Sequence, residues 1–321
     1  MKPATAMTTL LEAVAIMAAG KLLFAAQDVI IKEMSGTYPI HEIMTIRGVV
    51  AIALLLLLIH FSLNLAALRL HHPGYHLLRG LLMFIAFMAF YIGLAEISLT
   101  TATALFFTAP FFITLLSIPL LGERVGARRF LGILAGFVGV LIVLRPDTEQ
   151  FSPVSLLPVI AAFFYALCQV LVRYARMSAP ASIMSLYASI SFAVMAPIMG
   201  WMLSGADPLA ASTPSEKTLA LPWSMPESFD LMLLTFTGVT SALGFMFMSY
   251  AYKNAQASRL APFEYVMIVW VTLLSYLVWG EVPDLPSIAG IVIIILSGIY
   301  VLHREEAAGE QPIAYTGLTR R

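Results

Sequence analysis

The chain has 321 residues, of which 60% are hydrophobic and only 11% are charged, whereas soluble domains carry about a quarter charged residues. This composition excludes an ordinary soluble domain, and the formal net charge of zero gives no indication of a nucleic-acid partner. Cys168 is the only cysteine, which excludes an internal disulfide and a multi-cysteine metal site.

Ten apolar blocks of roughly twenty residues follow one another, each long enough to cross a hydrocarbon core of about 30 Å as a helix. None shows the alternating polarity of a β-barrel strand, and a helix satisfies its own backbone hydrogen bonds in lipid. The sequence therefore predicts an all-α membrane protein with ten transmembrane helices. The predicted spans are 11–31, 40–61, 77–97, 99–121, 127–145, 154–173, 181–203, 229–252, 257–280 and 285–302.

Basic residues predict the orientation, because lysine and arginine are enriched in cytoplasmic loops. With the N-terminus inside, three basic residues (Lys32, Arg145 and Lys217) face outward and thirteen face the cytoplasm. We therefore expect both termini to be cytoplasmic, including a tail at 305–321. The cytoplasmic set is Lys2, Arg69, Arg79, Arg124, Arg128, Arg129, Arg173, Arg176, Lys253, Arg259, Arg304, Arg320 and Arg321.

The chain repeats a short phrase: TLLSIPLLGE at Thr114–Glu123 returns 158 residues later as TLLSYLVWGE at Thr272–Glu281. Earlier in each half the matching offset is 141, and the difference of 17 residues falls at 204–228, an expected extracytoplasmic loop insertion. Each half then holds five spans, and because five is odd, the second half enters the membrane from the opposite side. Two inverted five-helix repeats are typical of secondary transporters, whose mirrored halves alternate access to a site near the midplane.

Two long stretches carry a family resemblance. YIGLAEISLTTATALFFTAPFFITLLSIPLLGERVGARRFLGILAGFVGVLIVLRP (Tyr91–Pro146) and YAYKNAQASRLAPFEYVMIVWVTLLSYLVWGEVPDLPSIAGIVIIILSGIYVLHR (Tyr250–Arg304) resemble the two EamA-like halves of the drug/metabolite transporter superfamily. The resemblance implies EamA-like repeats at 11–146 and 153–304, and export or import of a small metabolite across the inner membrane of a bacterium. The stretch AAQDVIIKEMSGTYPIHEIMTIRG resembles members that move riboflavin or S-adenosylmethionine.

Four charged residues lie inside the predicted spans and away from their ends, where charge is costly and by default indicates function. Lys21, Phe24 and Asp28 lie on one helix face, which either lines a central cavity or is a snorkelling or internally paired set that fixes packing. Arg47 is expected to contact either substrate or helix-end carbonyls, and Glu264 to be a substrate partner or a proton-titrating group. Because these two acids and two bases form a neutral set, pairing among them is favoured.

Aromatic and polar residues complete the candidate substrate site. Tyr91, Phe107, Tyr165 and Tyr265 are expected to face a cavity between the two halves, with Gln169 on the same helix face as Tyr165. Such a lining suits an amphipathic or planar solute, for example one resembling riboflavin, S-adenosylmethionine or an amino acid.

Other functions have less support in the sequence. His71, His72 and His76 are expected in a solvated cytoplasmic loop rather than at a metal site. No motif of a membrane enzyme is present, and no cofactor is expected. An integral membrane enzyme and a non-transporting scaffold remain alternatives to a secondary transporter, which we expect to be a monomer or a homodimer in the lipid bilayer.

Overall fold

The computed structural model describes residues 3–62, 73–123, 126–144, 153–174 and 180–280, together with 284–286, 288–293, 296–297 and 300. These residues form helices and connecting turns, with no strand among them. The predicted tail at 305–321 lies outside the described residues. The α-helices are α1 (Pro3–Met34), α2 (Ile40–Ser62), α3 (Pro73–Leu94), α4 (Leu99–Phe106), α5 (Ala109–Leu121), α6 (Ala127–Leu144), α7 (Leu156–Tyr174), α8 (Ala181–Leu203), α9 (Pro214–Ala220), α10 (Ser228–Asn254), α11 (Ala257–Leu260) and α12 (Val266–Trp279), with 3-10 turns at Pro153–Ser155 and Ala261–Tyr265.

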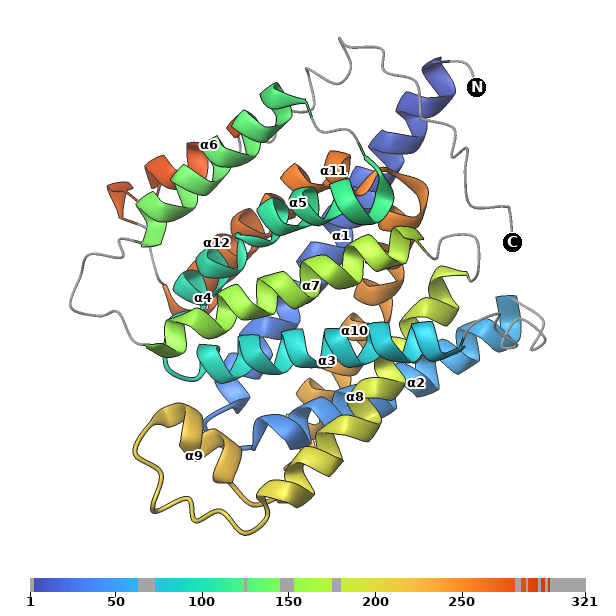
Figure 1. Cartoon of the computed structure of the whole chain (residues 1–321). Helices are drawn as coiled ribbons and strands as arrows, with labels where there is room; N and C mark the ends of the chain where they lie inside the picture. The colour runs from blue at the N-terminus through green and yellow to red at the C-terminus, as the bar shows by residue number, and fades with distance from the viewer. Residues whose placement is uncertain are drawn as a thin grey trace.

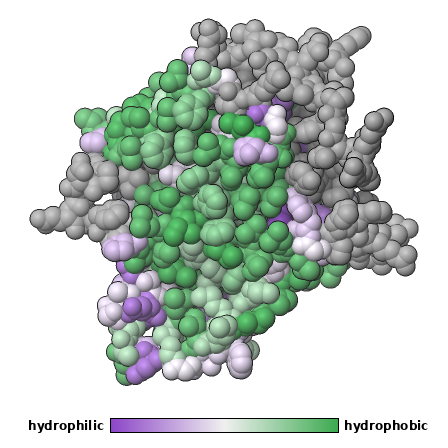
Figure 2. Space-filling model, viewed as in Figure 1, coloured by the Kyte–Doolittle hydropathy of each residue, from purple (hydrophilic) through white to green (hydrophobic). Residues whose placement is uncertain are grey.

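Six stretches of the described chain are long and apolar enough to cross a membrane, and three shorter apolar helices accompany them. Apolar side chains cover much of the outer surface, and the face shown in Figure 2 is predominantly hydrophobic over the helices, with polar residues gathered near α9. The side chains of Leu57, Leu131 and Leu277 are each more than half exposed, which suits contact with lipid tails. The chain is therefore a multi-pass helical membrane protein.

Two of the predicted spans are interrupted, and a proline lies at or just after each interruption. The span predicted at 99–121 breaks at Phe107 and Thr108, where Pro110 lies in the first turn of α5. The span predicted at 257–280 is divided into α11, the 3-10 turn that contains Pro262, and α12. Proline lacks a backbone N–H and clashes with the preceding turn, so it favours a kink or break in a helix. The two breaks fall at the same place in the repeat, because residues 107 and 265 differ by the offset of 158.

The repeated phrase ends on glycines with the same conformation. Gly122 ends α5 with φ of 64°, and Gly280 ends α12 with φ of 68°. A left-handed residue at the end of a helix favours glycine, which has no Cβ to clash. The glycines of the two GE pairs therefore stop equivalent helices. Glu123 is described, whereas Glu281 lies outside the described residues.

The helices form one bundle in which contacts recur between the halves (Figure 1). Helix α1 packs along α10, α3 along α7, and α2 along α8. In the repeat, α7 corresponds to α1, α8 to α2 and α10 to α3. The α1–α10 contact of one half is therefore equivalent to the α7–α3 contact, and the α2–α8 contact is equivalent to itself. The α2–α8 contact is close at Gly48, where an added Cβ would lie 2.7 Å from the backbone nitrogen of Ala193.

The connection from α8 to α10, expected to be a polar loop, contains α9 and packs onto one end of the bundle, here called the α9 end (Figure 1). Thr213 accepts from the Glu216 N–H at 3.2 Å, and Glu216 accepts from the Ser212 N–H at 2.8 Å. The first bond is half of a capping box, whereas Glu216 reaches back to Ser212, one residue before the N-cap. The hydrogen bonds from Ser212 hold the pKa of the Glu216 carboxyl below its ordinary value.

The α9 connection (residues 204–227) is hydrogen bonded to the first turn of α2. The indole N–H of Trp223 donates to His41 Nδ1 at 2.6 Å, and the two rings stack. His41 Nε2 lies 3.2 Å from the carbonyl oxygen of Leu219. Because indole only donates, His41 accepts through Nδ1 and donates through Nε2, which is the arrangement of a neutral ring.

Candidate functional site

A buried ion pair joins α1 to the 3-10 turn that precedes α12. The Lys21 ammonium contacts the Glu264 carboxylate directly, and both side chains are 2% exposed. The Tyr165 hydroxyl accepts from Lys21 at 3.1 Å and donates to Glu264 at 3.1 Å. Tyr252 donates a second hydrogen bond to Glu264. A buried charge pair is tolerated when its remaining atoms are hydrogen bonded, and the two tyrosines supply those bonds.

Asp28 lies two turns further along α1 on the same face. It accepts from the Tyr91 hydroxyl at 2.7 Å, and Tyr91 in turn accepts from the Gln27 amide at 3.0 Å. Within the described part of the chain, no lysine or arginine lies within ion-pair distance of Asp28. Asp28 is therefore held by a neutral donor, and none of the described cations touches it.

Arg47 on α2 is fully buried and is enclosed by aromatic rings rather than by acids. Its guanidinium carbon lies 4.6, 4.9 and 5.4 Å from the ring centroids of Phe87, Phe192 and Phe245. Nη1 donates to the Met44 sulfur, whereas Nε and Nη2 have no hydrogen-bond partner among the described residues. Of the four charges predicted inside the spans, Lys21 and Glu264 pair with each other, whereas Asp28 and Arg47 do not pair directly.

A narrow cavity lies beside these groups, bordered by Lys21, Asp28 and Tyr165. The centre of a water-sized sphere can move within about 30 Å³ of it, whereas ligand pockets commonly measure about 300–1,000 Å³. The space at this site thus holds little more than water. The remaining lining residues are Phe24, Ala86, Phe87, Phe90, Thr103, Phe106 and Met267.

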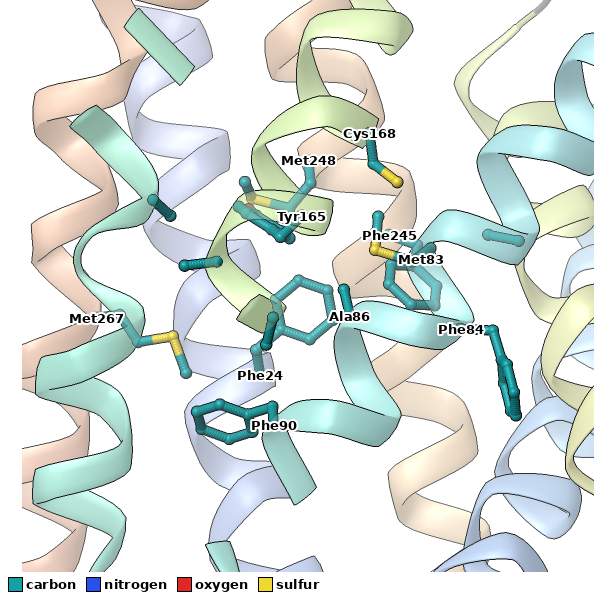
Figure 3. Close-up of a cluster of buried hydrophobic side chains, with 14 of the residues drawn as sticks. Phe24, Met83, Phe84, Ala86, Phe90, Tyr165, Cys168, Phe245, Met248 and Met267 are labelled. Atoms are coloured by element: carbon teal, nitrogen blue, oxygen red, sulfur yellow. The ribbon is translucent and has the colours of Figure 1, made fainter. Parts of the chain in front are cut away.

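The lining is predominantly aromatic and sulfur-containing. Figure 3 shows Phe24 of α1 among Tyr165 of α7, Phe90 of α3 and Met267 of α12. The Phe24 ring also packs edge-on against Phe245, with centroids 5.4 Å apart. Tilted and edge-to-face rings and the Met267 thioether present a polarisable apolar surface that accommodates planar groups.

The other predicted site residues lie close to the cavity but do not all line it. Gln169 is buried and contacts the Tyr165 hydroxyl. Phe107 and Tyr265 pack against each other with ring centroids 5.6 Å apart, and neither borders the cavity. The Tyr265 ring lies against α6, because a Cβ added at Gly136 would meet it at 2.8 Å. This pair therefore joins the two broken spans where they break.

Sequence reasoning missed Tyr252, and it misplaced His76. Tyr252 lies in a long apolar run with no signal that distinguishes it from a packing residue. His76 belongs to α3 and is buried against Tyr75 and Tyr187, not in a solvated loop, because α3 begins at Pro73 rather than at residue 77. His71 and His72 lie outside the described residues. Over the described residues, no group of three histidines, cysteines or acids could hold a metal ion.

Comparison with known proteins places this geometry in context. The model of the EamA-like transporter family matches residues 11–145 and 153–303. The chain is 28% identical over 263 residues to the S-adenosylmethionine uptake transporter of Rickettsia bellii, covering 82% of this chain and 83% of that protein. It is 33% identical over 242 residues to the riboflavin transporter of Vibrio cholerae, covering 74% of each.

A solved crystal structure agrees with the fold. It superposes with a TM-score of 0.74 at 16% identity and covers 92% of this chain and 98% of that one. The family and the named relatives are transporters rather than enzymes. With two matches that together span most of its length, the chain belongs to the EamA-like transporter family.

Proposed function

We propose that this protein is a secondary transporter that moves a small organic metabolite across the inner membrane of a bacterium by alternating access. Its ten transmembrane helices form two inverted halves, residues 11–146 and 153–304. Both termini are cytoplasmic and the α9 end faces outward. The excess of basic residues on the opposite side supports this orientation, and the recurrence of helix breaks and helix pairs in both halves supports the repeat.

The observation that carries the proposal is the narrow cavity between the halves. Its charged and aromatic lining comes from α1, α3 and α4 on one side and from α7 and α12 on the other. A rearrangement that moves one half against the other would enlarge this space toward one membrane face at a time. The lining of rings, thioethers and charges suits an amphipathic or planar solute, such as one resembling riboflavin, S-adenosylmethionine or an amino acid.

The Lys21–Glu264 pair is placed to couple this rearrangement to the binding of a proton or of the solute. Opening the cavity between α1 and the 3-10 turn separates the two charges, and an unpaired charge at this depth costs about 2.5–3.5 kcal/mol on insertion scales. A proton on Glu264, or a charged group of the solute, removes that cost. We therefore propose that Glu264 exchanges its bond to Lys21 for a proton or for substrate during each cycle.

Uptake by the purified protein in liposomes tests the function. The panel contains radiolabelled S-adenosylmethionine, riboflavin and tryptophan, each offered with and without an imposed pH gradient. We expect protein-dependent uptake of at least one solute that saturates with concentration. If no panel member enters faster than in protein-free liposomes, although the protein is folded and inserted, the result supports a non-transporting scaffold.

A further inference from the structure

We propose that the transported solute is dipolar, with an anionic group that binds Arg47 and a cationic or donor group that binds Asp28 and Gln27. This inference rests on the proposed transport function and specifies the chemistry of its substrate. Lys21 and Glu264 already neutralise each other, whereas Arg47 and Asp28 lack a direct partner of opposite charge among the described residues. The site therefore offers one receptor for each sign of charge.

Arg47 has the properties of an anion receptor that is covered in the closed state. Its side chain is completely buried, and Nε and Nη2 donate to no acceptor in the described part of the chain. Burying such donors without acceptors is costly, and the surrounding rings compensate only part of that cost. A carboxylate can accept from both nitrogens at once in the fork geometry that guanidinium favours.

Phe87 separates Arg47 from the cavity. The same ring borders the cavity and lies 4.6 Å from the guanidinium carbon. Phe87 is only partly buried, whereas Phe192 and Phe245 on the other sides of the guanidinium are buried. Movement of this one side chain would connect the cavity to Arg47 without unpacking the other two rings.

The opposite end of the solute site is rich in acceptors. Asp28 borders the cavity and carries one hydrogen bond, from Tyr91. Gln27 uses its amide nitrogen to bond Tyr91, and no described residue donates to its buried Oε1. An ammonium or sulfonium group beside Asp28 would satisfy the carboxylate, and an N–H of the solute would satisfy Gln27. Tyr91 lies beside both acceptors and 5.8 Å from the Phe87 ring centroid.

The two halves of the repeat do not carry the same charges, so the positive and negative ends of the site have a fixed order. Phe87 and Phe245 occupy equivalent positions at the offset of 158, and they flank Arg47 from the two halves. The charges themselves have neutral counterparts: Gln169 for Asp28, and Tyr187 or Ala188 for Arg47. A solute with separated charges can therefore satisfy the site in only one orientation.

Matched solutes that differ by one carboxylate test the inference. Wild-type protein in liposomes is given S-adenosylmethionine against its decarboxylated form, and tryptophan against tryptamine, with riboflavin as the uncharged planar solute. Loss of a hydrogen-bonded charge contact raises KM by about 10- to 100-fold. We therefore expect at least one zwitterion to have a KM lower by this factor than that of its decarboxylated partner. In Arg47→Met the preference should disappear, and in Arg47→Lys it should return in part.

Two controls separate this role from a structural one. Methionine fits an aromatic cage, and replacing a buried charge by an apolar residue is often neutral for stability, so Arg47→Met should keep its melting temperature. Lys217→Met removes an exposed charge in the α9 connection and should keep the preference for the zwitterion.

The outcomes distinguish the inference from the transport function. Equal uptake of both members of each pair by wild type, uptake of riboflavin alone, or an unchanged preference in Arg47→Met would overturn the dipolar assignment while leaving transport intact. Absence of any uptake would contradict the transport function itself and this assignment with it.

Discussion

Glu123 Oε1 accepts a hydrogen bond from the backbone N–H of Ala257 at 3.2 Å, which connects the end of α5 to the first residue of α11. A carboxylate is favourable beside the N-terminus of a helix, where backbone N–H groups lack partners. Glu123 thus follows its own helix in the chain but caps a helix of the other half. This contact gives a physical reason for the acid of the first GE pair.

Removing this cap is expected to loosen the contact between the halves. Glu123→Ala should lower the free energy of unfolding by about 0.5–2 kcal/mol, the usual effect of losing a helix cap. Glu123→Gln keeps an acceptor without the charge and should fall between the alanine variant and wild type. Thermal unfolding in detergent measures the effect, and a melting temperature unchanged in Glu123→Ala would show that the contact is not stabilising.

The Lys21–Glu264 pair should show strong coupling between its two members. Lys21→Met or Glu264→Leu alone leaves an unpaired buried charge and should destabilise the protein by about 3–5 kcal/mol. The double variant removes both charges and should recover much of that loss. A double-mutant cycle on melting temperatures measures this coupling, and additive losses would mean that the charges do not interact in the folded protein.

Cleavage by trypsin measures how firmly the α9 connection packs against α2. Lys217 is the only basic residue between Arg176 and Lys253, so cleavage in this stretch occurs at one site. Trp223→Phe keeps the stacking on His41 but removes the N–H donor, and Trp223→Ala removes both contacts. A net hydrogen bond contributes about 1 kcal/mol, so cleavage after Lys217 should be several-fold faster in the phenylalanine variant and faster still in the alanine variant.

Met225 supplies the control for this experiment, because it lies in the same connection and is 94% exposed. Met225→Ala should be cut at the wild-type rate. Cleavage of Trp223→Ala at the wild-type rate would show that the His41 contact does not hold the connection in place.

The α2–α8 contact is expected to be intolerant of even one added methyl group. Gly48→Ala places a Cβ 2.7 Å from the backbone nitrogen of Ala193, so the helices must separate at a cost of about 1–3 kcal/mol. Gly36→Ala is the matched control, because nothing lies within 4 Å of its added Cβ. Thermal unfolding compares the two variants, and equal melting temperatures would contradict the close approach.

Much of the helical fold could be predicted from the sequence, because the length and polarity of an apolar block reflect the thickness of the bilayer. The positions of the helix breaks could not be predicted in the same way. Pro110 and Pro262 lie inside otherwise apolar runs, where proline is tolerated in membrane helices if neighbours satisfy the freed backbone groups. The capping pattern of Thr213 and Glu216 was a readable signal for α9 that the polarity of the loop concealed.

The site was predictable as a set of charges but not as a geometry. A neutral set of four charges indicates pairing, yet which base meets which acid depends on how α1 packs against the second half. Lys21 reaches Glu264, 243 positions away in the chain, whereas Asp28 bonds Tyr91. The enclosure of Arg47 by three phenylalanines also required the packed structure, because those rings come from α3, α8 and α10.

We propose that this family member transports a metabolite through the cavity beside the Lys21–Glu264 pair. The most direct test compares uptake driven by a pH gradient between wild type and Glu264→Gln in liposomes. Glutamine keeps the shape and an acceptor for Tyr165 and Tyr252 but cannot exchange a proton. We expect the gradient to accelerate uptake by the wild-type protein several-fold and to leave uptake by the folded Glu264→Gln protein unchanged. Equal acceleration of both proteins by the gradient would contradict the role assigned to this ion pair.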